Sequence, residues 1–191
     1  MKKVITISRQ YASGGRTIGK MVADQLGIPL YDTKIIKDTM EKTGLSEEII
    51  KAAEQRVTSS FLFNLAMGVD DAHNYMKQIE KAEHEIIQGY VEQGPCVIVG
   101  RSANFVLDET DSVNVFVFSD VKNRISYAVD HYAIDEKQAK LMIEKSDHER
   151  KMHAMSFYSK EWGEKNNYDL LLNSGKLGIE KCVEIIVNAA K

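Results

Sequence analysis

Glycine and cationic side chains are concentrated in one short segment near the start of the sequence. Positions 8 to 17 read SRQYASGGRT, and this segment lies between an apolar run and an amphipathic stretch. The N-terminus of a helix presents free N–H groups and the positive end of the helix dipole, and glycine lets the backbone approach an anion closely. The sequence therefore predicts a phosphate-binding loop. Its candidate contacts are Arg9, Ser13, Gly14, Gly15, Arg16 and Thr17.

This loop departs from the phosphate-binding consensus, which reads GxxxxGK followed by Ser or Thr. In one register Gly15-Arg16-Thr17 replaces Gly-Lys-Thr, but Gln10 then stands where the first glycine belongs. Two other interpretations remain open. The segment could be a tight turn that only serves the start of the helix. It could also bind a dinucleotide, since Asp32 stands where a ribose-binding acid would lie, although the glycine spacing does not fit GxGxxG.

A second candidate group follows the apolar run CVIV at positions 96 to 99. Gly100 and Arg101 come directly after this run, and ligands of a parallel sheet bind beyond the carboxyl ends of its strands. A guanidinium at this edge can hold a phosphate through two parallel hydrogen bonds, so we expect Arg101 to face the phosphate loop. The alternative is that Arg101 pairs with a carboxylate at the surface.

A third group lies in the charged segment DHERKMH at positions 147 to 153. Arg150 belongs to this segment, and Arg124 lies on the helical stretch before it. Charged runs of this kind are usually solvated helix faces, so surface positions are the alternative for both arginines. His148 and His153 are five residues apart and do not share a helical stripe, which argues against a metal site built on them.

Five short apolar runs must position these groups. They are mostly apolar on successive residues, which is typical of strands covered on both faces, as in a parallel sheet. The predicted strands are Val4 to Ser8, Ile28 to Tyr31, Cys96 to Val99, Val113 to Phe118 and Tyr168 to Leu172. Helical periods at positions 18–26 and 179–187 follow the first and the last run, so we expect an α/β fold with right-handed crossovers.

Two stretches of the sequence contain helical patterns alone. Residues 33–93 include a helix start at Ser46, and Gly94-Pro95 closes this insert. The second stretch runs from about position 120 to 159, where Asp135 and Gln138 resemble a capping box. A chain of 191 residues has the length of one domain, so we expect a single sheet with two helical excursions.

Composition excludes several classes of partner. The net charge is -3 and 28% of the residues are charged, which argues against broad binding to nucleic acid. No apolar run approaches the roughly 18 residues of a membrane span, and the apolar part of MKKVITIS is too short for a signal peptide. We therefore expect a cytoplasmic protein without nucleic-acid or membrane partners. Cys96 and Cys182 lie in apolar surroundings without CxxC spacing and are interpreted as buried thiols.

The ordered segments ISRQYASGGRTIGK, GIPLYD, CVIVGRSANFVL, DHER and YDLLLNSGKLGIE resemble the cytidylate kinase-like family of P-loop nucleoside monophosphate kinases. The resemblance covers both ends and the middle of the chain, whereas residues 33–93 carry little of it. It implies a P-loop NTPase-type three-layer α/β fold with a five-stranded parallel sheet in a single kinase domain, 1–191. The implied parts are a core of residues 1–32, 94–119 and 168–191, a helical NMP-binding insert at 33–93 and a lid at 120–167.

The resemblance also implies ATP and Mg²⁺ as cofactors. It assigns the loop Gly14, Gly15, Arg16, Thr17 to the ATP phosphates, with the hydroxyl of Thr17 or Ser13 near the metal ion. Asp32 and Arg101 would face the monophosphate. Arg124 and Arg150 would belong to the lid and neutralise charge on the transferred phosphoryl group, which is a catalytic role in such transfers.

Cytidylate kinases proper carry a lysine in the phosphate loop, and this chain does not. When the loop is aligned by its distance to Gly27-Ile28-Pro29, Gly15 falls at the lysine position. The catalytic cation must then come from Arg16 or Arg9. We expect Arg16 to serve, because it follows Gly15 at the helix start and its planar fork can bridge two phosphate oxygens.

The function implied by this resemblance is transfer of the γ-phosphoryl group of ATP to a pyrimidine nucleoside monophosphate, CMP or dCMP first. The partners would be these small nucleotides, and the oligomeric state is left open. A protein of another class is the alternative, namely a nucleotide-binding regulatory protein that has the kinase fold and little or no turnover. The missing lysine favours this alternative.

Overall fold

One parallel sheet of five strands forms the centre of the molecule, as the sequence predicts. The computed structural model describes residues 4–54, 69–107 and 111–191, with the backbone alone at 51–54 and 69–73. The strands are β1 (Val4–Arg9), β2 (Leu30–Tyr31), β3 (Cys96–Val99), β4 (Ser112–Phe118) and β5 (Leu170–Asn173). Their order in the sheet is β2-β3-β1-β4-β5. The strand that leads into the glycine-rich loop therefore lies in the middle of the sheet.

Two strands begin later than the apolar pattern predicts. β2 begins at Leu30 because Pro29 has no N–H to donate, although its carbonyl oxygen still accepts from the N–H of Val97 at 2.9 Å. β5 begins at Leu170 because the carboxylate of Asp169, at 2.7 Å, accepts from the backbone N–H of Asn114. A side-chain oxygen thus takes the place of a ladder carbonyl at this position.

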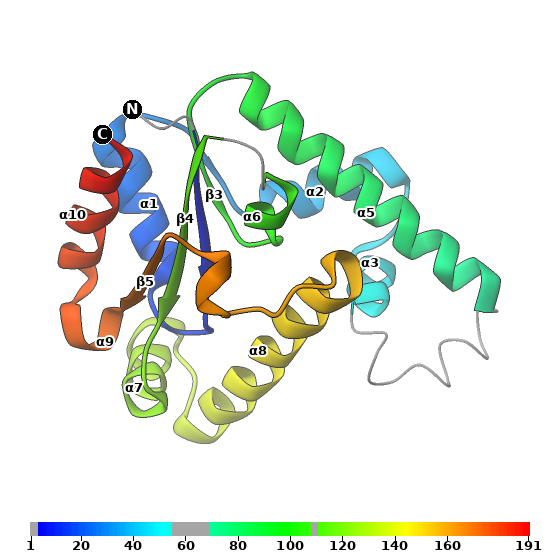
Figure 1. Ribbon diagram of the computed structural model, residues 1–191. Helices are drawn as coiled ribbons and strands as arrows, with labels where there is room; N and C mark the ends of the chain where they lie inside the picture. The colour runs from blue at the N-terminus through cyan, green and yellow to red at the C-terminus, as the bar shows by residue number, and fades with distance from the viewer. Residues whose placement is uncertain (1–3, 55–68, 108–110) are drawn as a thin grey trace.

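Helices cover both faces of the sheet and give the molecule three layers (Figure 1). One face carries α1 (Gly15–Leu26) and α10 (Ile179–Ala190), and the other carries α2 (Lys34–Thr43), α5 (Val69–Glu92) and α6 (Ala103–Val106). On the α1 side, Ile7 of β1 packs in one apolar cluster with Ile18 and Ile186. On the α5 side, Ile98 of β3 packs with Ile87 in a second cluster. Apolar burial on both faces explains why the strands are apolar on successive residues.

The remaining elements gather near the carboxyl ends of the strands. They are α3 (Glu47–Glu54), α7 (Val121–Tyr132), α8 (Glu136–Tyr158), a 3₁₀ turn (Lys165–Asn167) and α9 (Ser174–Leu177). The expected capping box at the start of α8 is confirmed, since the side chain of Asp135 accepts from the N–H of Gln138 and the Gln138 side chain accepts from the N–H of Asp135. In Figure 1 α8 crosses below the ends of the strands.

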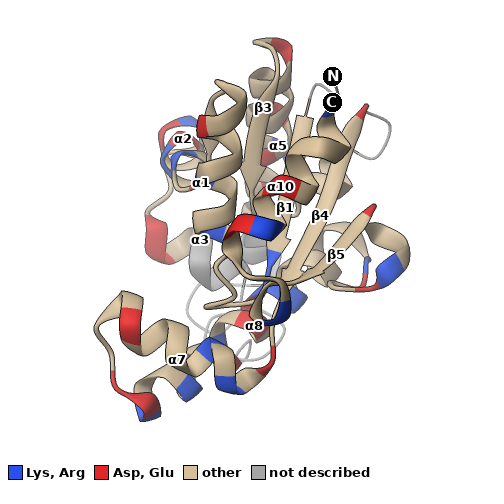
Figure 2. Ribbon diagram, turned by 90° about the vertical axis from the view of Figure 1, so that its left-hand side faces the viewer, with Lys and Arg blue, Asp and Glu red and all other residues tan. Residues whose placement is uncertain are grey.

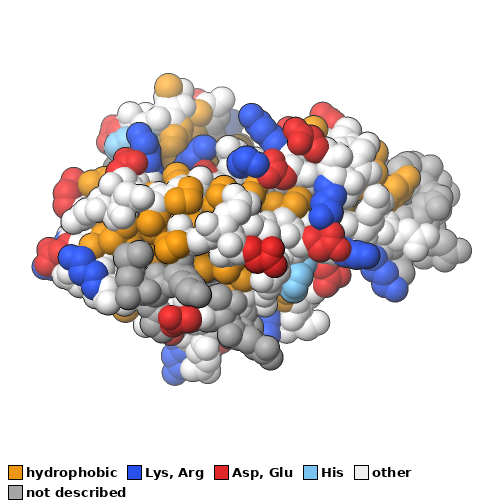
Figure 3. Space-filling model, turned by 90° about the horizontal axis from the view of Figure 1, so that it is seen from above, with side chains coloured by type: hydrophobic (Ala, Val, Ile, Leu, Met, Phe, Trp, Pro, Cys, Tyr) orange, Lys and Arg blue, Asp and Glu red, His pale blue; other side chains and the backbone are white. Residues whose placement is uncertain are grey.

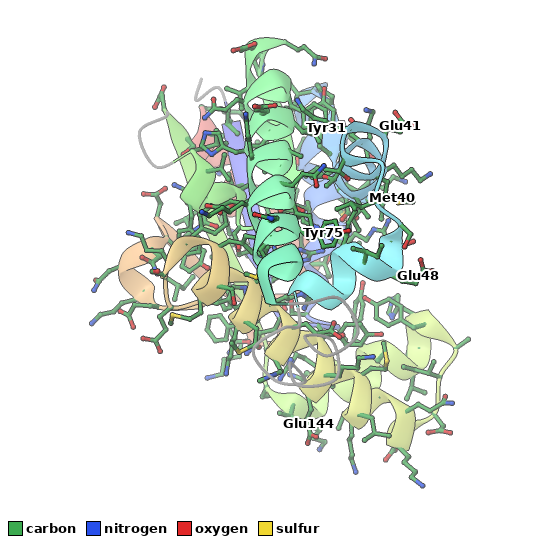
Figure 4. All side chains as sticks on the ribbon, turned by 90° about the vertical axis from the view of Figure 1, so that its right-hand side faces the viewer. Tyr31, Met40, Glu41, Glu48, Tyr75 and Glu144 are labelled. Carbon is green, nitrogen blue, oxygen red and sulfur yellow. The ribbon has the colours of Figure 1, made fainter. Side chains whose placement is uncertain are left out.

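The helices of the 33–93 segment pack on one another and on α8. Tyr31 lies beside α5, where its ring stacks on Tyr90 with 3.6 Å between ring centroids (Figure 4). Met40 of α2 packs against a small apolar cluster that includes Ile79 of α5 and Phe157 of α8. The end of α8 is therefore held against the helices that precede β3.

The surface at the opposite end of the molecule, where the strands begin, is partly hydrophobic. Figure 3 looks onto this end and shows a band of hydrophobic side chains bordered by charged ones. None of the helices in the described part of the chain has both the length and the apolar character that a membrane crossing requires. Cys96 and Cys182 are buried free thiols, as predicted.

Candidate active site

A cavity of about 640 Å³ lies where the strands end, beside the glycine-rich loop. Its lining includes residues from that loop, from the turn after β3 and from α8. Five Arg or Lys side chains but two Asp or Glu side chains line it, so its charge is suited to an anion. In Figure 2 segments with Lys and Arg lie between the ends of the strands and α8.

The loop exposes the N-terminus of α1 to this cavity. Gly14 precedes the helix with a φ of 74°, and no side chain caps the helix there. This positive φ favours glycine, and a Cβ on Gly14 would lie 2.4 Å from the Cδ1 atom of Ile179, which would have to move. The first N–H groups of a helix have no intrahelical acceptor, and Gly14, Gly15 and Arg16 line the cavity. This arrangement can bind a phosphate group.

The two hydroxyl groups proposed as metal ligands do not line the cavity. The Ser13 hydroxyl is buried and donates to the carbonyl oxygens of Gln10 at 2.9 Å and Val117 at 3.2 Å. The Thr17 hydroxyl lies 2.8 Å from the hydroxyl of Tyr127 on α7. In the described ranges, no group of three His, Cys, Asp or Glu side chains could hold a metal ion. The residues predicted to bind magnesium therefore do not fit a protein-built metal site at the cavity.

Arg9, the last residue of β1, reaches into the cavity and is 19% exposed. Its guanidinium lies 3.7 Å from the carboxylate of Asp32. Burial first, and then the positive charge of Arg150, lower the pKa of Arg9 to about 9 against the opposing effect of Asp32. The guanidinium is still charged at neutral pH, at a position where an additional anion would stabilise it.

Arg16 lies at the outer edge of the same site. Its side chain is 65% exposed, and its Nε atom lies 2.5 Å from the carboxylate of Asp32. Asp32 also lines the cavity, as expected for a residue at the end of β2, but it is paired with both Arg9 and Arg16. The Asp32 carboxylate is thus paired with two guanidinium groups. A contact between Asp32 and a monophosphate stays a prediction.

Arg101 lies in the cavity wall, and the carboxylate that it pairs with is buried. Its NH1 group donates to Oε1 of Glu83 on α5 at 3.0 Å, and Glu83 is only 1% exposed. The other Glu83 oxygen lies 3.3 Å from Nε2 of His153 on α8, and Nδ1 of His153 lies 3.0 Å from the hydroxyl of Ser102. Burial raises the pKa of Glu83, but Arg101 and His153 outweigh it, so the net pKa is lowered. An ionised carboxylate therefore connects α5, α8 and the turn after β3.

Arg150 and Arg124 meet at one carboxylate, that of Asp147 on α8. Arg124 contacts Asp147 at 2.5 Å and Arg150 contacts it at 3.3 Å, while the backbone N–H of Tyr11 donates to it at 2.7 Å. Arg150 also donates to the carbonyl oxygen of Arg9 at 3.0 Å and lines the cavity. Arg124 is buried and is not among the lining residues. Of the two, Arg150 can reach a ligand, and Arg124 holds the loop and α8 together.

Sequence reasoning missed Glu83, Asp147 and His153 as site residues. A signal for Glu83 was present, because it stands between Ile79 and Ile87 on the buried stripe of α5, where an unpaired charge is costly. Asp147 and His153 belong to a charged run that gives no such signal. Only the packing of α8 against the phosphate loop makes that run part of the site.

Known proteins provide an independent comparison. The model of the cytidylate kinase-like family matches residues 4–176. The chain is 26% identical over 189 residues to a cytidylate kinase of Archaeoglobus fulgidus, and the alignment covers 98% of this chain and 94% of that protein.

Solved structures share the fold. A structure of an uncharacterized protein from Eubacterium ventriosum matches with a TM-score of 0.73 and 22% identity, covering 98% of this chain and 97% of that one. A shikimate kinase from Bacteroides thetaiotaomicron matches with a TM-score of 0.52 and 13% identity, covering 97% of each chain. The P-loop NTPase-type fold and the family match over most of the sequence agree, and this protein belongs to the cytidylate kinase-like family.

Proposed function

We propose that the protein transfers the γ-phosphoryl group of ATP to a nucleoside monophosphate, CMP or dCMP first. The bond from the γ-phosphorus to the bridging oxygen of ADP breaks, and a bond to a phosphate oxygen of the monophosphate forms. The products are ADP and the nucleoside diphosphate. The observation that carries this proposal is the convergence of Arg9, Arg101 and Arg150 on one cavity beside an uncapped helix N-terminus. Phosphoryl transfer depends on such positioning and charge neutralisation.

The proposed division of the cavity follows the origin of its side chains. The N-terminus of α1 would bind the ATP phosphates, and Arg101 would bind the phosphate of the monophosphate. Residues 33–93 would serve as the monophosphate-binding insert, since Glu83 from this segment orients Arg101. Residues 120–167 would serve as the lid and contribute Arg150, whose charge faces the transferred group.

We propose that ATP enters as its magnesium complex. Mg²⁺ keeps several waters and is bound largely through substrate phosphates in enzymes of this kind. This proposal needs no hydroxyl ligand from Ser13 or Thr17, which agrees with their contacts elsewhere. When bound, the ion would neutralise negative charge on the phosphates.

The experiment that tests this function measures ADP release with MgATP and a panel of monophosphates, namely CMP, dCMP, UMP, AMP and GMP. We expect turnover to be fastest with CMP or dCMP, because a relative that this chain resembles is named cytidylate kinase. The nucleoside diphosphate should appear in equal amount to ADP. ADP release that is independent of the monophosphate would contradict the proposal.

One observation favours the alternative that this is a nucleotide-binding regulatory protein, namely the absence of lysine from the loop. Under this alternative the protein binds nucleotides and turns them over slowly or not at all. Calorimetric titration with MgATP and CMP separates the two, since a regulatory protein would bind at least one nucleotide while releasing no ADP in the assay above.

A further inference from the structure

The phosphate loop differs from the consensus motif at positions 9 and 15. When the consensus lysine is aligned with Gly15, the second consensus glycine falls on Gly14 and the first falls on Arg9. The chain therefore has an arginine where the consensus has glycine, and a glycine where it has lysine. Arg16 then stands at the Ser or Thr position.

The two exchanged residues touch in the structure. A Cβ built on Gly15 would lie 2.5 Å from Cβ and 2.9 Å from Cγ of Arg9. The stem of Arg9 thus fills the space in which a longer side chain at position 15 would begin. A lysine at position 15 and an arginine at position 9 are mutually exclusive in this backbone.

A second glycine leaves room for the end of the same side chain. A Cβ on Gly100 would lie 1.9 Å from NH1 of Arg9, so a side chain at position 100 would displace this guanidinium from its place. Arg9 therefore extends from the start of α1 to the end of β3, directly before Arg101. Its guanidinium lies between the two places proposed above for the ATP phosphates and for the monophosphate.

We propose that Arg9, through the slot formed by Gly15 and Gly100, supplies the cation that the consensus lysine supplies in other phosphate loops. The proposal rests on the function proposed above and replaces our sequence-based expectation for Arg16. That side chain is 65% exposed and is directed to Asp32 at the rim. Arg9 instead starts from a central strand and is fixed by two glycines.

The charges around Arg9 support this role. Arg150, Arg101 and Arg16 all act to lower its pKa, and Asp32 is the carboxylate that acts in the other direction. Asp32 is shared with Arg16, whose Nε atom lies closer to it. A phosphate anion in the cavity would therefore stabilise the charged form of Arg9.

An exchange of the two residues tests the proposal. Arg9→Gly should lower kcat by a factor on the order of 10² to 10³, the typical loss for one transition-state donor. Gly15→Lys alone should also lower kcat, because the lysine side chain would clash with the side chain of Arg9. The double variant Arg9→Gly with Gly15→Lys restores the first glycine and the lysine of the consensus, and its kcat should be at least about tenfold above that of Arg9→Gly. No recovery in a folded double variant would contradict the proposal.

A binding measurement separates this proposal from the proposed function. Arg9→Met keeps the stem and removes the charge, and calorimetry with MgATP should show affinity reduced about tenfold or more. The matched control, Lys181→Met on α10, removes the same charge at an exposed position that does not line the cavity, and it should bind MgATP as the wild type does. Wild-type affinity and rate in Arg9→Met would overturn the role of Arg9, whatever the double variant does. No turnover in the wild type with any monophosphate would instead refute the kinase function. The MgATP affinities of the wild type and of Arg9→Met would still show whether Arg9 binds the ATP phosphates.

Discussion

Removal of the Asp147 carboxylate should destabilise the protein and separate α8 from the phosphate loop. This carboxylate is 14% exposed and accepts hydrogen bonds from Tyr11, Arg124 and Arg150. In Asp147→Ala, the guanidinium of Arg124 stays buried without this partner. Breaking a buried ion pair from one side costs about 3 to 5 kcal/mol, and the partial exposure of Asp147 places our expectation near the lower value, about 3 kcal/mol.

Urea unfolding followed by circular dichroism measures this loss in the free energy of unfolding. For a domain of this size, about 3 kcal/mol corresponds to a fall in Tm of roughly 6 to 12 °C. Glu144→Ala is the matched control, because Glu144 lies on the same helix with its side chain exposed (Figure 4), and it should change stability by less than about 0.5 kcal/mol.

A double-mutant cycle identifies the pair responsible. Arg124→Ala combined with Asp147→Ala should cost less than the sum of the two single variants, since the double variant leaves no unpaired charge at this contact. A loss below about 1 kcal/mol in Asp147→Ala, or additive losses in the cycle, would refute the reasoning.

The remaining predictions concern the cavity and its surroundings. Arg101→Ala should weaken CMP binding by about 1.5 to 3 kcal/mol in calorimetry, and an unchanged CMP affinity would argue against a contact between Arg101 and the monophosphate. The same variant should lower the urea midpoint of unfolding, because it leaves the buried Glu83 carboxylate with His153 alone. Arg16→Ala should lower kcat by less than about tenfold, since exposed ion pairs contribute about 0 to 1 kcal/mol. Chelation of Mg²⁺ by EDTA should abolish ADP release and an excess of Mg²⁺ should restore it. Burial raises the pKa of Cys96 to about 11, so iodoacetamide at pH 8 should label the unfolded protein at least about tenfold faster than the folded one, as mass spectrometry can show.

Local sequence patterns determined the elements of this protein and the edge of the sheet at which the cavity lies. Apolar runs with β-branched residues predict the five strands, and the first of them leads directly into the glycine-rich loop. The capping box at Asp135 is equally local, because its hydrogen bonds join residues three positions apart. In a parallel sheet the carboxyl ends of all strands meet at one edge, so Arg9 and Arg101 could be assigned to the same site from sequence alone.

Tertiary structure alone decided how the charged side chains of the site are paired. Arg16 was the preferred cation in the sequence because it is adjacent to the loop glycine, yet its side chain is exposed at the rim, and Arg9 takes the slot between two glycines. The partners of Asp147 and Glu83 come from distant segments of the chain. The periodicity of a helix shows which residues share a face, but not which element that face will meet. Which buried charges pair depends on this long-range packing. Local sequence patterns therefore do not predict these pairs.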